Sequence, residues 1–167
     1  MKILVIGPSG AGKTFVSAKL REKGVNAPDA DLVEGLSGWF DGKGNKVECP
    51  PDAGPEFLDN HEFLWNREFL KKYLQDKKGI YLFGMSGNVF EMTDLFDKVY
   101  FLTAPPNFLR ERLQHPSREN PMGKTDYQVE NAVTYGSEIE ARAKELGIEM
   151  IDANKTPEEI FEVISSI

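Results

Sequence analysis

The sequence of 167 residues and 18.8 kDa has the length of one domain and is long enough to bury a hydrophobic core. Hydrophobic residues make up 40% of it and charged residues 28%, the balance of an ordinary globular protein, which excludes a disulfide scaffold, a coiled coil and a disordered chain. The net charge of −7 and the pI near 5.0 argue against general binding to nucleic acids, because an acidic surface repels a polyanion.

The cysteine content and the apolar runs limit the compartment. The single cysteine, Cys49, cannot form an internal disulfide, and together with two histidines it offers too few ligands for an ordinary zinc site. A reducing, cytoplasmic location fits best. The longest strongly apolar runs, 3–6 and 80–83, contain four residues, whereas a membrane span needs about 20. We therefore expect no membrane partner.

Unbroken apolar runs alternate with segments of helical periodicity along the chain. An unbroken apolar run is typical of a strand that is covered on both faces of a parallel sheet. The expected strands are 3–6, 25–28, 80–83, 99–102 and 148–151, and the expected helices are 13–23, 62–77, 107–114, 126–146 and 157–164. The alternation predicts one α/β domain, 1–167, with a parallel sheet joined by right-handed crossovers.

Two segments interrupt this pattern. Residues 31–54 are rich in Gly, Asp and Pro and carry Trp39 and Phe40, a composition that predicts an irregular excursion over one end of the sheet. We expect residues 31–64 to cover the acceptor substrate. Residues 114–125 contain two prolines and few apolar residues, which is the composition of a mobile lid.

The sharpest motif follows the first expected strand. It is the complete phosphate-binding pattern G-x-x-x-x-G-K-[ST], formed by Gly7, Pro8, Ser9, Gly10, Ala11, Gly12, Lys13 and Thr14. Its glycines let consecutive backbone N–H groups curl around phosphates, and the helix that follows adds its positive N-terminal end. We expect Lys13 to bind the outer phosphates of ATP or ADP and Thr14 to bind the accompanying Mg²⁺. A glycine-rich turn without a ligand is the alternative.

With this motif near the start of an α/β chain, the sequence resembles the small P-loop kinases of the nucleoside monophosphate kinase and shikimate kinase group. The resemblance implies a P-loop NTPase fold of the nucleotide kinase type. That fold has three layers, α/β/α, around a five-stranded parallel sheet. It also implies an ATP-dependent kinase activity.

The run Asp29-Ala30-Asp31 resembles the Asp-x-Asp of the shikimate kinase branch. The resemblance implies that one carboxylate lies near Mg²⁺ and the other faces the acceptor hydroxyl. A carboxylate at the carboxyl end of a strand can take the hydroxyl proton or orient the nucleophile. Asp29 and Asp31 are therefore both catalytic candidates, and Asp29 is also a metal candidate. Acidic residues in a solvated turn are the alternative.

The third expected strand ends at Phe83-Gly84 without the carboxylate that general P-loop NTPases carry there. This resembles the glycine-ended third strand of shikimate kinases, which implies room for the acceptor beside Gly84. It also shifts metal binding to Thr14 and Asp29. A simple turn is the alternative.

Two arginines resemble the nucleotide-binding arginines of the same kinases. The resemblance implies that Arg112 lies against adenine and that Arg118 reaches the transferred phosphoryl group, with Lys124 adding charge from the far side of the lid. A guanidinium suits both tasks, because it stacks flat and forks to phosphate oxygens. Solvated surface arginines are the alternative for both positions.

The segment 151–157 follows the last expected strand as the adenine loop does in this group, so that Asn154 and Pro157 would bracket the base. The alternative has equal weight. It is an ordinary strand-to-helix turn in which Thr156 caps the helix and Pro157 is its first residue.

The sequence leaves the acceptor open. Arg67 resembles the acceptor-binding arginine of shikimate kinases, but it equally suits a surface ion pair. Trp39, Phe40 and Trp65 suit either stacking on a flat acceptor or packing under a loop. Tyr135 stands roughly where a second acceptor arginine is expected, which argues against shikimate itself.

We therefore predict a kinase that uses ATP and Mg²⁺ to phosphorylate a small metabolite, either a nucleoside, a nucleotide or a hydroxylated acid. We expect it to act as a monomer or dimer. The alternative is a nucleotide-binding ATPase or regulatory protein with little phosphotransfer, which would not need the Asp29 and Asp31 pair. A GTPase is disfavoured, because Pro157 stands where the Asn-Lys-x-Asp guanine signature needs Asp.

Overall fold

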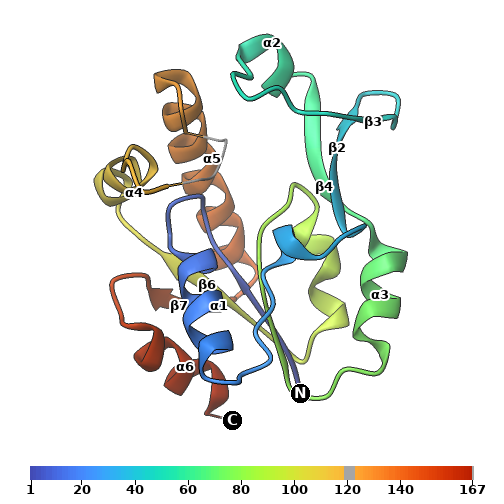
Figure 1. The fold of residues 1–167 in the computed structure, drawn as a ribbon, viewed down its shortest axis with the longest axis vertical. Helices are drawn as coiled ribbons and strands as arrows, with labels where there is room; N and C mark the ends of the chain where they lie inside the picture. The colour runs from blue at the N-terminus through green and yellow to red at the C-terminus, as the bar shows by residue number, and fades with distance from the viewer. Residues whose placement is uncertain (119–122, 167) are drawn as a thin grey trace.

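The computed structural model describes residues 1–118 and 123–166 of the chain. Its centre is a parallel sheet in the order β5-β1-β6-β7. The strands are β1 (Lys2–Ile6), β5 (Ile80–Phe83), β6 (Lys98–Thr103) and β7 (Glu149–Asp152). Both chain ends lie at the lower edge in Figure 1, so the carboxyl ends of the strands point to the upper edge. The predicted α/β fold with a parallel sheet is confirmed.

The count of five regular strands is wrong by one. The backbone N–H of Phe83 donates to the carbonyl of Pro28 (3.0 Å), and Asp29 forms a single parallel bridge with Phe83, but residues 25–28 form no regular strand. Proline has no N–H, so this short segment can only accept at that position. The segment still extends the sheet beyond β5, and it carries Asp29 to the carboxyl edge.

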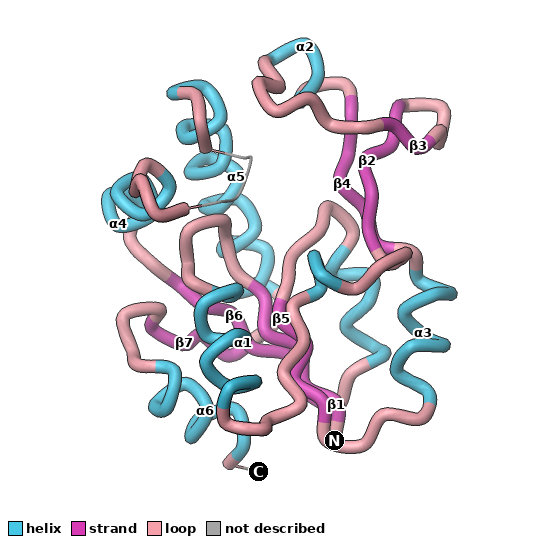
Figure 2. The backbone as a smooth tube through the Cα atoms, in the orientation of Figure 1, coloured by secondary structure: helices cyan, strands magenta, loops and turns pink. Residues whose placement is uncertain are grey.

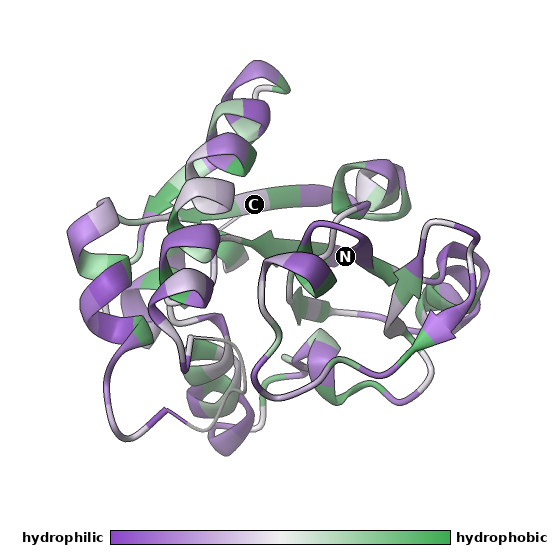
Figure 3. Cartoon of the chain, turned by 90° about the horizontal axis from the view of Figure 1, so that it is seen from above, coloured by the Kyte–Doolittle hydropathy of each residue, from purple (hydrophilic) through white to green (hydrophobic). Residues whose placement is uncertain are grey.

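Helices cover both faces of the sheet, as the three-layer prediction requires. On one face α1 (Lys13–Glu22) and α6 (Pro157–Ser165) pack against Ile3 and Val5 of β1. On the other face α3 (Arg67–Gln75), the 3-10 helix η2 (Val89–Leu95) and the second half of α5 (Asp126–Glu145) pack against Leu4 and Ile6. Figure 3 shows the apolar strands enclosed between helices whose outer faces are polar.

The remaining predicted helices have the expected positions. The predictions at 13–23, 107–114, 126–146 and 157–164 correspond to α1, α4 (Pro106–Leu113), α5 and α6. Within the described part of the chain, no helix is both long enough and apolar enough to cross a membrane.

The part of the chain that connects α1 to α3 contains regular structure, and two predictions about it are wrong. Residues 31–54 are not irregular throughout, because β2 (Ser37–Asp41) pairs antiparallel with β3 (Lys46–Val47). The helix expected from residue 62 begins later, since residues 61–65 form β4 (His61–Trp65), which pairs with β2. Figure 2 shows these strands and the short α2 (Pro55–Leu58) standing above the carboxyl edge of the main sheet.

An aromatic pair explains why this segment becomes a sheet. Trp39 on β2 lies directly opposite Phe63 on β4, with 5.5 Å between ring centroids, and such cross-strand pairs stabilise a sheet. Phe57 of α2 packs against the same Trp39 ring at 5.5 Å. Asn66 then ends the strand and caps α3 by accepting a hydrogen bond from the N–H of Phe69 (3.0 Å). We call residues 31–64 the cover segment.

Candidate active site

The phosphate-binding motif forms a tight loop between β1 and α1. Gly10 and Gly12 have φ values of +90° and +91°, which favour glycine over residues with a side chain. At Gly7 a Cβ atom would lie 2.8 Å from the carbonyl oxygen of Leu102, so only glycine lets the loop lie this close to β6. Ser9 and Ala11 complete the turn ahead of Gly12, which caps α1. The loop therefore presents backbone N–H groups at the positive end of a helix.

Lys13 extends over this loop. Its ammonium group donates hydrogen bonds to the carbonyls of Gly7 (2.6 Å) and Pro8 (2.8 Å). Burial of the ammonium lowers the pKa of Lys13 from 10.5 to about 8, and the charges of Asp31 and Asp29 oppose this shift. The cation and the curled backbone form a cradle that fits the phosphates of a nucleotide.

Asp29 and Asp31 lie together beside the cradle. Asp29 is only 4% exposed, and its carboxylate accepts a hydrogen bond from the N–H of Asp31 (2.9 Å), which caps the 3-10 helix η1 (Ala30–Leu32). Asp31 faces solvent at the open side of the site. Partial loss of hydration raises the pKa of the Asp31 carboxyl, the neighbouring Asp29 raises it further, and Lys13 acts in the opposite direction.

The protein oxygens available for a metal ion at this site are few. Thr14 is exposed on the first turn of α1, and Asp29 ends the segment beside β5. Among the described residues, no group of three or more His, Cys, Asp and Glu side chains gathers as a ready metal site. The two oxygen donors that are present, on Thr14 and Asp29, match the one or two protein ligands that Mg²⁺ takes in a nucleotide site, where phosphate oxygens and water fill its other positions.

Arg112 of α4 lies against the phosphate-binding loop. Its guanidinium carbon is 4.3 Å from the ring centroid of Phe108, a cation–π contact. One of its terminal nitrogens is 2.7 Å from the point that a Cβ on Gly12 would occupy. The planar group is thus held next to the start of α1.

Arg118 approaches the same region from the segment after α4. Its charge contributes to the lowered pKa of Lys13, so the two cations lie close enough to repel each other. Burial lowers the pKa of the Arg118 guanidinium, and one terminal nitrogen is buried without a hydrogen-bond partner among the described residues. A buried donor of this kind fits an anion between Arg118 and Lys13. Of the lid expected at 114–125, residues 119–122 lie outside the described residues.

The loop between β7 and α6 has the geometry of an ordinary helix start. The hydroxyl of Thr156 accepts from the N–H of Glu159 (3.2 Å) in a capping box, and Pro157 is the first residue of α6. The side chain of Asp152 accepts from the N–H of Asn154 (2.9 Å), and the Asn154 side chain is exposed. The capping alternative thus describes the local structure, and it leaves Asn154 and Pro157 accessible to a base.

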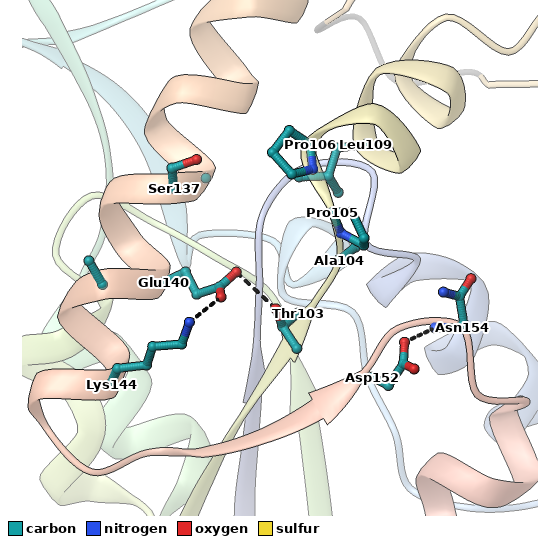
Figure 4. Close-up of a pocket in the computed structure, with 12 residues that line it drawn as sticks. Thr103, Ala104, Pro105, Pro106, Leu109, Ser137, Glu140, Lys144, Asp152 and Asn154 are labelled. Carbon is teal, nitrogen blue, oxygen red and sulfur yellow. Dashed lines mark hydrogen bonds and ion pairs between the residues drawn. The ribbon is translucent and has the colours of Figure 1, made fainter.

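A cavity of about 650 Å³ lies beside this loop, between α5 and the connections that follow β6 and β7 (Figure 4). Glu140 accepts hydrogen bonds there from the hydroxyl of Thr103 (2.9 Å) and the ammonium of Lys144 (2.7 Å). Asn154 lines the cavity, but residues 7–14 do not. The cavity is therefore adjacent to the candidate nucleotide site and distinct from the phosphate cradle.

The space beside Gly84 is filled by protein. A Cβ on Gly84 would lie 2.5 Å from the Cβ of Ala30 and 2.7 Å from the indole of Trp65. The glycine therefore makes room for Ala30 and Trp65, the residues that flank the cover segment, and the prediction that it makes room for an acceptor is wrong. Asn88 fixes Trp65 in this position, because its side chain accepts from the backbone N–H of Trp65 (2.9 Å) and donates to the backbone carbonyl of Trp65 (3.0 Å).

Arg67 is committed to an ion pair on the outside of α3. Its two terminal nitrogens donate to the two carboxylate oxygens of Asp94 (2.8 and 2.6 Å), and one of them also donates to the carbonyl of Glu91. The surface ion pair is therefore the correct alternative for Arg67. Trp65 packs in the core, and Trp39 packs with Phe57 and Phe63, so these indoles follow the packing alternative.

Sequence reasoning missed two residues that shape the site. Gln128 is fully buried and bonds to both the cover segment and the residues before α5. Asn88 anchors Trp65 to the loop after β5. Neither residue belongs to a motif, and each acts on residues distant in sequence, so no local signal identifies them.

Comparison with solved structures identifies the fold. A shikimate kinase from Acinetobacter baumannii in complex with shikimate is similar over 98% of this chain and 92% of its own, with a TM-score of 0.61 and 18% identity. A deoxyadenosine kinase from M. mycoides with bound dATP is similar over 99% and 97%, with a TM-score of 0.52 and 14% identity. A gluconokinase from Sinorhizobium meliloti 1021 is similar over 98% and 89%, with a TM-score of 0.52 and 16% identity.

These likenesses establish the fold of the small P-loop kinases, as the resemblance implied. No curated protein matches the sequence. A family model described as AAA domain matches residues 3–141, which include the phosphate cradle, the aspartate pair and most of α5. The chain therefore belongs to this AAA domain family of P-loop proteins.

Proposed function

We propose that this protein is a kinase that transfers the γ-phosphoryl group of ATP to a hydroxyl group of a small metabolite. The observation that carries the proposal is the aspartate pair, Asp29 and Asp31, held beside the ammonium of Lys13 at the mouth of a phosphate cradle. A protein that only binds nucleotide needs the cradle but not a second carboxylate there. We propose that it works in the cytoplasm, as a monomer or dimer.

The cradle would hold the phosphates of ATP. The backbone N–H groups of Ser9, Gly10, Ala11 and Gly12 would donate to the inner phosphates, and Lys13 would leave the carbonyls of Gly7 and Pro8 to bind the outer ones. Thr14 and Asp29 are the ligands that we propose for Mg²⁺. When bound, Mg²⁺ would offset the negative charge of the phosphates.

Asp29 also supplies the carboxylate that is missing from the end of β5. It bridges to Phe83, so its side chain stands beside that strand end although it comes from another segment. The absence of an acidic residue after Phe83 is thus no argument for an inactive nucleotide binder.

Asp31 is the better candidate for the proton acceptor. Asp29 is buried and its carboxylate is bound to the Asp31 N–H, whereas the Asp31 carboxyl is open to the site and has a raised pKa. In the proposed reaction the acceptor oxygen bonds to the γ-phosphorus, the bond to the β–γ bridging oxygen breaks, and ADP leaves. The hydroxyl proton passes to Asp31.

Arg118 would stabilise the phosphoryl group in transit. One of its terminal nitrogens is buried with no hydrogen-bond partner among residues 1–118 and 123–166, and the charge of Arg118 acts on Lys13. An anion between the two cations would offset their mutual repulsion and satisfy this donor. Arg112, Asn154 and Pro157 are the residues that we propose for binding the adenine base.

The test is ADP release from ATP, measured with and without Mg²⁺ and with a panel of nucleosides, sugars, sugar acids and nucleoside monophosphates. We expect acceptor-stimulated release that depends on Mg²⁺ and is lost in Lys13→Ala and Asp31→Asn. Asp76→Asn, at the exposed end of α3, is the matched control and should keep full activity. Tight ADP binding with no stimulation by any acceptor would instead support a nucleotide-sensing protein.

A further inference from the structure

The far end of the cover segment is bonded to the start of α5. The side-chain amide of Gln128 donates to the carbonyl of Ala53 (3.1 Å), and the hydroxyl of Tyr127 donates to the carboxylate of Asp59 (3.2 Å). Ala53 is only 1% exposed, and Gln128 is fully buried. Figure 1 shows α2, which lies between Ala53 and Asp59 in the chain, and α5 both rising above the carboxyl edge of the main sheet. The cover segment therefore reaches from the end of β5, beside which Trp65 packs, to the start of α5.

The amide oxygen of Gln128 holds a different part of the chain. It accepts hydrogen bonds from the backbone N–H groups of Gly123 (3.0 Å) and Lys124 (2.9 Å). The orientation of the amide follows from its partners, because turning it over would direct its NH₂ group at two donors and its oxygen at the carbonyl of Ala53. Gln128 therefore ties Ala53 to Gly123, and its two ends cannot exchange partners.

Gly123 lies against the end of α4. Its φ value of +99° favours glycine, and a Cβ on it would lie 3.3 Å from the carbonyl oxygen of Leu113. Leu113 is the last residue of α4 and is 3% exposed. Gly123, Lys124 and Leu113 line one cavity of about 300 Å³. The residues that Gln128 holds are thus packed on α4.

Leu113 in turn lies against the phosphate-binding loop. Its Cγ is 3.4 Å from the point that a Cβ on Gly10 would occupy, and the carbonyl oxygen of Leu109, one turn earlier in α4, is 3.2 Å from the same point. The loop and the cover segment are therefore connected through two buried side chains, Leu113 and Gln128, with Gly123 between them.

A connection of this kind can transmit the effect of binding. Phosphates in the cradle would bond to the backbone N–H groups around Gly10 and restrict the motion of the loop. A loop that moves less restricts the residues packed on it, and a further segment that docks on those residues then loses less conformational entropy. The two sites become coupled, and such coupling is reciprocal.

We propose that Gln128 is a positioning residue that couples the phosphate cradle to the cover segment. A nucleotide in the cradle holds the cover segment more firmly against α5, and an acceptor enclosed by the cover segment raises the affinity for the nucleotide by the same factor. Gln128 itself touches neither substrate. The inference rests on the proposed function, because it requires a nucleotide in the cradle, and it adds the residue that connects nucleotide binding to acceptor binding.

Amide hydrogen exchange of the whole chain, followed by mass spectrometry of its peptides, measures this coupling. The N–H groups of Ala53, Leu58, Asp59 and Asn60 are hydrogen-bonded within the cover segment, so their exchange requires the segment to open locally. The probe is the β,γ-imido analogue of ATP with Mg²⁺ at saturating concentration. We expect the analogue to slow the exchange of these amides at least about fivefold in the wild-type protein. Equal exchange with and without the bound analogue would overturn the inference.

Two substitutions separate coupling from simple attachment. Gln128→Leu removes both ends of the amide bridge and should abolish the effect of the analogue on exchange while the analogue still binds. Tyr127→Phe is the matched control, because it removes the neighbouring bond to Asp59 but leaves the route from Gly10 to Ala53 complete. It should speed exchange equally with and without the analogue, so that the effect of the analogue stays at about fivefold. Equal loss of the effect in both variants would reduce Gln128 to a structural contact.

A shorter amide and the binding measurement itself complete the test. Gln128→Asn keeps a polar group but cannot reach Gly123 and Ala53 together, so it should also lose the effect, and an effect that persists in either Gln128 variant would overturn the inference. Failure of the analogue to bind, or binding that Lys13→Ala leaves unchanged, would refute the nucleotide site of the proposed function and the inference with it. Binding that depends on Lys13 without slower exchange in the cover segment would refute only the inference.

Discussion

The side-chain amide of Gln128 donates a hydrogen bond to the carbonyl of Ala53 (3.1 Å), although 75 positions separate the two residues. The same nitrogen lies 3.4 Å from the carbonyl of Pro51, and the amide oxygen accepts from the N–H groups of Gly123 (3.0 Å) and Lys124 (2.9 Å). Gln128 is fully buried. One side chain thus joins the cover segment to the residues that precede α5.

Replacing this amide should destabilise the protein. Gln128→Leu keeps most of the volume but removes the partner of the buried Ala53 carbonyl, and a buried backbone group costs about 1–3 kcal/mol when it is left unsatisfied. We expect the free energy of unfolding, measured by urea titration, to fall by about 1–3 kcal/mol. Gln75→Leu, on the exposed end of α3, is the matched control and should change stability by less than about 0.5 kcal/mol. Equal stability of the two variants would contradict this account.

Gly84 is the point where the cover segment meets the main sheet. An added Cβ would lie 2.5 Å from Ala30 and 2.7 Å from Trp65, and both neighbours are buried. Overpacking of this kind lowers the free energy of unfolding by about 1–3 kcal/mol. We therefore expect Gly84→Ala to unfold at a lower urea concentration than wild type. At Gly42 a Cβ meets nothing within 4 Å, so Gly42→Ala serves as the control. A Gly84→Ala protein as stable as wild type would show that Trp65 can move aside freely.

The parts of the fold that depend on local pattern can be predicted from the sequence. The runs around Leu4, Leu82 and Phe101 are unbroken because both faces of these strands are buried, and the phosphate cradle follows from glycines whose backbone angles exclude other residues. The Thr156 cap is local in the same way, since its partner Glu159 is three positions away.

The structure of the cover segment depends on contacts between residues that are distant in sequence, so it cannot be predicted from local pattern. The segment 61–65 becomes a strand because Phe63 meets Trp39 on the neighbouring strand β2, whereas the sequence around it also fits a helical period. The environment of Gly84 is likewise set by Trp65, which arrives from another segment. A glycine in the sequence shows that space is needed but does not show what fills it.

The lowered pKa of Lys13 predicts a pH dependence of nucleotide binding. With a pKa of about 8 in the free protein, Lys13 is protonated at pH 7 and loses its proton as the pH rises through 8. Bound phosphate favours the charged form and raises this pKa, so ADP binding above pH 8 requires proton uptake. Between the free and bound pKa values, the Kd for ADP should rise by up to about tenfold per pH unit.

Calorimetric titration of ADP between about pH 7 and pH 10 measures this effect. The Lys13→Ala protein should bind weakly and without the rise, because the titrating group is gone. A wild-type Kd that stays constant over this range would mean that Lys13 keeps its proton throughout or does not touch the phosphates.

Arg112 and Arg110 lie on the same helix, α4. Comparing variants of the two distinguishes a proposed nucleotide contact from a surface ion pair. Arg112 is held between Phe108 and the phosphate cradle, whereas Arg110 is exposed and bound to Glu130 (2.8 Å). If Arg112 stacks on the base, Arg112→Leu should weaken ADP binding about tenfold, or about 1.4 kcal/mol, and leave the affinity for inorganic tripolyphosphate unchanged. Arg110→Leu should bind both ligands as wild type does. Equal losses of affinity for ADP and for tripolyphosphate in Arg112→Leu would show that Arg112 binds the phosphates and not the base.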